Sequence, residues 1–245
     1  MLYLEDKVAK IVDIVSTVLP KDGCLGVYDD DPDFIYGDLD GEIDRVLRKL
    51  DPDIYIAHGM SKIVIVSSII DYVIKIPLTG VWIPVWDEEE EEYNDDQTYF
   101  EPFSYGGGYH NDDYCAVEVD ICDETEYENP EYSFIFPKTF FYKEINQVRY
   151  YLQEKCKCGG DNPNGSISVE IEKTGRKLYE DEDQEYGSVE SLEWCISLVE
   201  NYGVEKSKEI MKYLRKMNIT DLHNGNIGYN KYGKPILLDF SGFDS

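Results

Sequence analysis

The sequence predicts an α+β protein in which a five-stranded antiparallel sheet precedes a second, mostly helical part. Runs of β-branched residues alternate with turn signals over residues 53–77 and again over residues 133–153. Apolar residues then recur at helical spacing over residues 188–217. A stretch rich in turn residues, 158–165, separates the two parts.

Composition limits the function. The 245 residues include 51 acidic and 23 basic residues, a formal net charge of −28. This charge argues against direct binding to nucleic acid. It suits a basic protein partner, a mimic of nucleic acid, or solubility alone. The six cysteines form no paired zinc pattern. With no signal peptide and no apolar run of membrane-spanning length, we expect a cytoplasmic protein with reduced thiols.

Residues 1–52 are expected to form a helical extension. One helix is predicted over residues 4–19, where Pro20 and Gly23 end it, and a second over residues 40–50. The residues could serve as a cap, as a contact for a partner, or in ordinary packing, and ordinary packing is favoured.

The first three strands are predicted within residues 53–66 and over residues 72–77. Lys75 lies inside the third strand. A single lysine in such a strand usually faces solvent from a sheet edge, so this position alone indicates no function.

The turn between the first two strands contains Gly59, Ser61 and Lys62. Backbone N–H groups, a hydroxyl and an ammonium group together can bind an anion. An ordinary hairpin turn accounts for the same residues.

Residues 84–113 are expected to be an acidic insertion between the third strand and the next helix. They contain an acid block at residues 87–92, interleaved aromatic residues and a triple glycine. Acid blocks are usually disordered or solvated. The aromatic residues make contact with a partner plausible.

A helix is predicted over residues 113–122, with Asp113 as its cap. Glu118 lies beside its apolar face, although a glutamate on a helix can equally face solvent. Asp120 and Glu124 are the other candidate carboxylates of this helix. Two further strands are predicted, at residues 133–142 and 147–153, joined by a turn at residues 144–146.

The helical part, residues 159–245, is predicted to contain helices over residues 188–201 and 203–217. A cap at Ser188 is one choice for the start of the first. The second helix carries most of the local positive charge.

The last stretch contains three side chains with oxygen atoms, Asp221, Asn226 and Asp239. Asp239 ends an apolar run, 236–238, that is typical of a short buried strand, and residues 230–233 form a turn signal. Carboxylate and amide oxygens suit Mg²⁺. The alternative is a hairpin that carries Asp and Asn at its turns, where both are common.

The order Asp-Leu-x-x-x-Asn followed by Leu-Leu-Asp-Phe resembles the catalytic loop and metal-binding segment of the protein-kinase-like superfamily. His223, two positions after Asp221, is similar to the aminoglycoside and choline phosphotransferases. The resemblance implies a kinase-like N-lobe at residues 53–158 and a reduced C-lobe at residues 159–245. A kinase-like protein of this small size also resembles those encoded by bacteriophages, which would place it in the host cytoplasm.

The resemblance implies roles for these residues. Asp221 would orient or deprotonate the acceptor hydroxyl, and Asn226 and Asp239 would hold Mg²⁺ on the phosphates of ATP. Lys75, oriented by Glu118, would neutralise phosphate charge.

The same resemblance implies residues that contact the nucleotide. They comprise a loop over the phosphates, the strand lysine, and a hinge whose backbone groups contact adenine: Gly59, Ser61, Lys62, Lys75, Glu154 and Cys156.

The chain departs from the family pattern. Residues 219–220 are Ile-Thr instead of His-Arg, residues 239–242 are Asp-Phe-Ser-Gly, and no activation segment follows. Phosphorylation of peptides at the usual surface is therefore not expected. Two hypotheses remain: a phosphotransferase acting on a protein or small-molecule hydroxyl, and a pseudokinase or acidic inhibitor that captures a basic partner.

Overall fold

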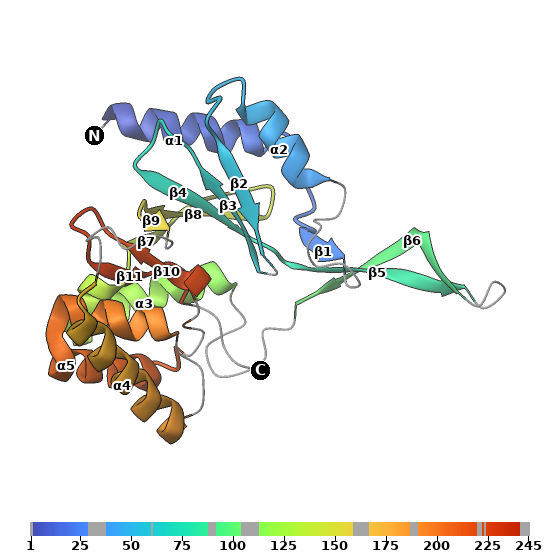
Figure 1. Ribbon diagram of the computed structural model, residues 1–245. Coiled ribbons are helices and arrows are strands. Elements are labelled where there is room, and N and C mark those ends of the chain that lie inside the picture. Colours follow the sequence, from blue (N-terminus) through green and yellow to red (C-terminus); the bar gives the residue numbers. More distant parts are fainter. Residues whose placement is uncertain are drawn as a thin grey trace. The chain divides into compact units, whose positions relative to one another are not determined.

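A computed structural model of the chain describes residues 2–28, 38–59, 61–87, 92–103, 113–158, 167–186, 191–219, 222 and 224–240. The chain folds into two compact units (Figure 1). The first comprises Met1–Val117 and Thr139–Glu154, and the second comprises Glu118–Lys138 and Lys155–Ser245.

The first unit is built on an antiparallel sheet of five strands. In chain order the strands are β2 (Tyr55–His58), β3 (Lys62–Val66), β4 (Tyr72–Pro77), β7 (Thr139–Ile145) and β8 (Val148–Glu154). Their order in the sheet is β2-β3-β4-β8-β7, so β4 is central (Figure 1). The predicted α+β class and the five-stranded antiparallel sheet are confirmed.

The strand predicted over residues 133–142 begins later than expected. Pro130–Ile135 form a 3₁₀ helix, η1, and β7 starts only at Thr139. Pro137 lies just before β7 and cannot donate a ladder hydrogen bond. The turn to β8 is Asn146 and Gln147, whose φ angles of 52° and 63° match the tight turn that favours hairpins.

Residues 1–52 share the core of this sheet. Helices α1 (Leu2–Val15) and α2 (Leu39–Leu47) place Ile11, Val15 and Ile43 in one buried cluster with strand residues such as Ile65 and Ile74. Figure 1 shows both helices beside the sheet. The apolar spacing predicted the helices, and both pack into the core of the first unit.

A second sheet forms where an insertion without regular structure was expected. Strands β1 (Gly26–Tyr28), β5 (Gly80–Asp87) and β6 (Glu92–Pro102) lie in the order β1-β5-β6. β5 and β6 pair antiparallel as a long hairpin (Figure 1), and β1 runs parallel to β5. A Cβ atom on Gly80 would meet the backbone of Glu101, so the three strands require glycine at this close approach. Residues 92–102 thus form a strand, while residues 88–91 and 104–112 lie outside the described residues.

The second unit is mainly helical. It contains most of α3 (Tyr114–Glu128), then α4 (Val169–Tyr186) and α5 (Leu192–Lys216). A small sheet, in the order β11-β10-β9, joins β9 (Lys157–Cys158), β10 (Ile227–Tyr229) and β11 (Pro235–Leu237). None of the helices in the described part of the chain is both long and apolar enough to cross a membrane.

The two helices predicted over residues 188–217 are one element with a kink. Gly203 has φ 74° and ψ 167°, a backbone conformation that is essentially limited to glycine. The helix begins at Ser191, whose Oγ accepts a hydrogen bond of 3.1 Å from the N–H of Trp194. Ser188, the cap considered from the sequence, lies outside the described residues.

A buried carboxylate joins α2 to the turn between β3 and β4. Asp51 accepts hydrogen bonds from Ser67 Oγ at 2.6 Å, from the N–H of Ser68 at 2.7 Å and from Ser68 Oγ at 2.9 Å. Burial alone would raise the pKa of Asp51. These hydrogen bonds, with another from the N–H of Asp53, outweigh burial and lower that pKa.

We therefore expect Asp51 to make stability depend on pH. Because its pKa is lower in the folded state, its contribution is fully present above its unfolded pKa of about 3.9 and is lost as pH falls through the folded value. Asp51→Asn should cost about 1–3 kcal/mol at pH 7, and the cost should shrink toward pH 3. Urea unfolding across this range measures it. A cost that does not change with pH would contradict this role.

Candidate functional site

The site that the sequence predicted starts from Lys75, which the structure buries at the centre of the sheet. Its side chain is 3% exposed. Its Cα pairs with Val64 of β3 on one side and with Tyr151 of β8 on the other. The expectation that a single lysine in such a strand faces solvent from a sheet edge is therefore wrong for Lys75. A charged side chain buried in a central strand is uncommon, and this makes Lys75 a candidate for a functional role.

The N-terminus of α3 is fixed to strand β8 by Asp113. The Oδ1 atom of Asp113 accepts a hydrogen bond of 2.8 Å from the N–H of Ala116, which confirms the predicted helix cap. Its Oδ2 atom accepts hydrogen bonds from the Tyr151 hydroxyl at 2.9 Å and from the Arg149 guanidinium at 3.2 Å. Asp113 is 7% exposed, so these bonds hold a nearly buried carboxylate.

Tyr151 connects this cap to the lysine. It is the residue opposite Lys75 in the β4–β8 pairing, and its hydroxyl is bound by Asp113. Burial, together with the negative charge of Asp113, raises the pKa of Tyr151. The phenol therefore remains protonated and keeps donating at neutral pH.

Glu118 follows one helical turn after the start of α3 and is 0% exposed. The solvent-facing reading of this residue is wrong. The two alternative carboxylates are less buried than Glu118, because Asp120 is exposed and Glu124 is partly exposed. Of the three carboxylates, Glu118 alone is buried, and α3 continues to Glu128, beyond the predicted end at residue 122.

The loop predicted to cover the phosphates is an ordinary closed turn. The N–H of Gly59 donates to the carbonyl of Lys62 at 3.1 Å, and the carbonyl of Ser61 accepts from the N–H of Leu78 at 2.9 Å. The N–H of Gly59 is thus hydrogen-bonded within the turn. Lys62 is buried, and Met60 lies outside the described residues.

The predicted hinge residues lie where the chain leaves the first unit. Glu154 is the exposed last residue of β8 and pairs with Tyr72 of β4. Cys156 is partly buried between β8 and β9.

The predicted metal ligands are brought together by the β10–β11 hairpin. Ile227 pairs with Leu237, and the N–H of Leu238 donates to the carbonyl of Asn226 at 2.7 Å. Asn226 and Asp239 therefore leave the same open end of the hairpin. Asn226 is 8% exposed and Asp239 is partly exposed.

Phe240, the residue after Asp239, anchors the open end of the β10–β11 hairpin. The ring of Phe240 is fully buried, and its centroid lies 4.8 Å from that of Phe136. The preceding loop is also anchored on both sides of Asp221, because the N–H of Ile219 donates to Leu214 and the carbonyl of Leu222 accepts from Ser191. Asp221 itself and His223 lie outside the described residues.

The donor set is an amide oxygen and a carboxylate. Within the described ranges no group of three or more His, Cys, Asp or Glu side chains could hold a metal ion. Asn226 and Asp239 supply two oxygen ligands, which suits an ion such as Mg²⁺ that keeps water and phosphate as its other ligands.

Sequence reasoning missed the link between Asp113 and Tyr151. The helix-cap pattern identified Asp113, but only the position of β8 beside β4 brings Tyr151 to it. Alternation along 147–153 could have placed Tyr151 on one face of a strand, yet it carried no information on which strand is its neighbour.

Comparison of the chain with protein-family models, with curated protein sequences and with solved structures finds no match.

Asp113 is expected to contribute strongly to stability. Asp113→Ala removes the cap and the acceptor for Tyr151 and Arg149, so it should cost about 2–4 kcal/mol. Asp113→Asn keeps a capping oxygen and should cost less. Guanidinium unfolding of both variants measures the difference, and equal costs would contradict the role of the carboxylate as a shared acceptor.

Proposed function

We propose that the chain is a kinase-like phosphotransferase that uses ATP and Mg²⁺ to phosphorylate a hydroxyl group of a protein or a small molecule in the cytoplasm. One observation carries the proposal: the β10–β11 hairpin brings Asn226 and Asp239 to one end, directly after the loop that contains Asp221. Buried Lys75 in a central strand and buried Glu118 in the following helix support it.

The residues fit a magnesium ion and a phosphate chain. Asn226 and Asp239 would hold the ion through oxygen atoms. Bound there, Mg²⁺ would neutralise charge on the phosphate oxygens. Lys75 would bind the phosphates from the sheet, and Glu118 would be its carboxylate partner in the proposed mechanism.

The acceptor side depends on Asp221. Its carboxylate would orient the acceptor hydroxyl and accept its proton as the phosphoryl group transfers. The flanking residues Ile219 and Leu222 are buried and hydrogen-bonded through their backbone groups. Positioning of this kind supplies much of the rate in phosphoryl transfer.

The net charge makes the metal ion essential to this proposal. A chain of charge −28 repels a triphosphate, and Asp221 and Asp239 add local negative charge. ATP binding should therefore depend strongly on Mg²⁺.

A thermal-shift titration with ATP tests the proposal. In wild type, with Mg²⁺ and ATP at about 100 times the Kd, binding adds about 2.7 kcal/mol and should raise Tm by about 5–10 °C. Asp239→Ala should abolish the rise, because it removes the charged ligand of the metal ion.

Asp123→Ala is the matched control, since Asp123 is an exposed carboxylate of α3 in the second unit. It should retain the full shift. A wild-type protein that shows no Mg²⁺-dependent shift, or an equal shift in Asp239→Ala, would contradict the assignment.

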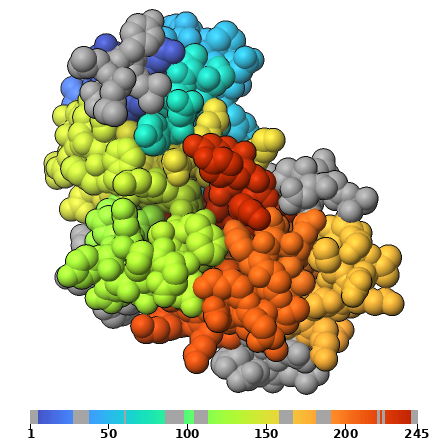
Figure 2. Space-filling model, turned by 90° about the vertical axis from the view of Figure 1, so that its left-hand side faces the viewer, coloured from blue at the N-terminus to red at the C-terminus, as the bar shows by residue number. Residues whose placement is uncertain are grey.

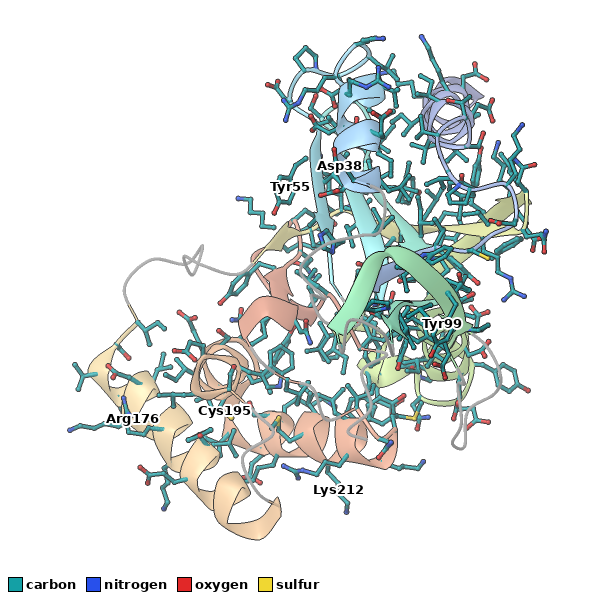
Figure 3. The ribbon with its side chains drawn as sticks, turned by 90° about the vertical axis from the view of Figure 1, so that its right-hand side faces the viewer. Asp38, Tyr55, Tyr99, Arg176, Cys195 and Lys212 are labelled. Atoms are coloured by element: carbon teal, nitrogen blue, oxygen red, sulfur yellow. The ribbon has the colours of Figure 1, made fainter. Side chains whose placement is uncertain are left out.

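A second candidate function is an acidic binding protein or pseudokinase that captures a basic partner, in the extreme form as a mimic of nucleic acid. The β5–β6 hairpin favours it, because eight of the ten residues at 87–96 are acidic and the hairpin exposes Tyr99 (Figure 3). Salt-sensitive capture of a basic protein that is unchanged by Asp239→Ala would support this function over the first.

A further inference from the structure

The second unit carries an open groove of about 570 Å³ beside the later part of α5. Residues of η1 form one side, and Lys212 and Lys216 of α5 line the other. Figure 2 shows the two surfaces adjoining, with α3 and η1 in green and α5 in orange. Every residue that lines the groove belongs to the second unit, and none belongs to the candidate nucleotide site.

The aromatic wall of the groove is rigidly held. Tyr132 and Tyr213 stack with ring centroids 4.4 Å apart, and the Tyr213 hydroxyl lies 2.7 Å from Thr125 Oγ1. Lys206 Nζ lies 4.3 Å from the centroid of the Tyr132 ring and 3.1 Å from a carboxylate oxygen of Glu209. Tyr213 is buried behind Tyr132, which is partly exposed, so Tyr132 and the Lys206 side chain over its ring are the parts of the wall that a ligand can reach.

A row of exposed lysines runs along α5 beside this wall. Lys208, Lys212 and Lys216 follow one another at intervals of four residues, and we call them the lysine ridge. Figure 3 shows Lys212 at the outer side of α5. Among the ion pairs of the described residues, none involves these three lysines.

Repulsion within the lysine ridge is only partly offset on α5 itself, where Glu205 and Glu209 precede Lys208 and Lys212 by three residues and Lys216 has no such glutamate. Like charges four residues apart repel one another on a helix. The helix dipole favours cations only in the last turn, which accounts for Lys216 but not for Lys208. The ridge also stands out in a chain of charge −28. An external counter-charge would relieve this repulsion.

We propose that the lysine ridge and the adjoining groove bind an acidic segment of a partner protein in an extended conformation. Lysines four residues apart lie about 6 Å apart along a helix. Alternate side chains of an extended peptide lie about 6.6 Å apart on the same side. Acidic residues at every second position therefore match the ridge, and a residue between them can contact the exposed part of Tyr132.

The surrounding charge defines the partner further. The rest of the chain is strongly acidic, so a long polyanion such as nucleic acid would be repelled beyond the ridge. Glu131 and Glu209 also line the groove; Glu209 is paired with Lys206, and Glu131 repels a carboxylate placed next to it. A short segment with spaced acidic residues satisfies both limits.

Fluorescence anisotropy with a labelled synthetic peptide tests the proposal. The probe is a peptide of about ten residues with glutamates at alternating positions around a tyrosine, at low ionic strength. Replacing the ridge by Lys208→Glu, Lys212→Glu and Lys216→Glu should weaken binding by at least about tenfold. A peptide of the same composition with contiguous glutamates should bind wild type several-fold more weakly than the alternating one.

The matched control is Lys10→Glu, Lys21→Glu and Lys49→Glu, three exposed lysines of the first unit, which gives the same net charge. It should change binding by less than about twofold. A Lys→Gln triple variant of the ridge, which should also lose binding, guards against misfolding of the reversed-charge variant. Equal loss in ridge and control variants would overturn the proposal, as would tighter binding of a DNA duplex, or self-association in ultracentrifugation that the ridge variant abolishes.

Discussion

The hydrogen bonds that the Asp113 carboxylate accepts are the interactions on which the candidate nucleotide site depends. It caps α3 and at the same time accepts a hydrogen bond from Tyr151, the strand neighbour of Lys75. One side chain thus fixes the start of the helix that carries Glu118 to the strand beside the lysine. A short, nearly buried carboxylate is suited to this, because its two oxygen atoms can serve a helix end and a strand together.

Charge is distributed unevenly over this protein, and the proposals follow that distribution. In the first unit, eight of the ten residues at 87–96 are acidic, whereas α5 of the second unit carries the lysine ridge. The buried Lys75 and Glu118 form a third group, held within the fold. A strongly acidic chain binds a triphosphate only through local cations. In the proposed reaction, Lys75 and a magnesium ion would supply the positive charge next to the phosphates.

Local patterns predicted the elements, and long-range pairing decided what they do. β-branched runs identified β3, β4 and β8, and helical spacing identified α1, α2 and α5. The burial of Lys75 could not be predicted, because it depends on β8 pairing with β4 across more than 70 residues of chain. The β5–β6 hairpin was missed because its acid block is typical of solvated segments. The pairing of β5 with β6 along the chain on either side of the block stabilises the two strands. The hairpin of β10 and β11 was predicted from its turn signal, since local geometry alone places the two ends of a hairpin together.

Equilibrium dialysis of ATP in the presence of Mg²⁺, on wild type and Lys75→Met, tests the account most directly. Lys75→Met keeps the length of the side chain and removes the charge that the account assigns to the phosphates. Lys49→Met removes an exposed lysine of the same unit and serves as the control. The account predicts that binding weakens by at least about tenfold in Lys75→Met and stays unchanged in Lys49→Met. Equal affinity in all three proteins, or no ATP binding by wild type, would contradict it.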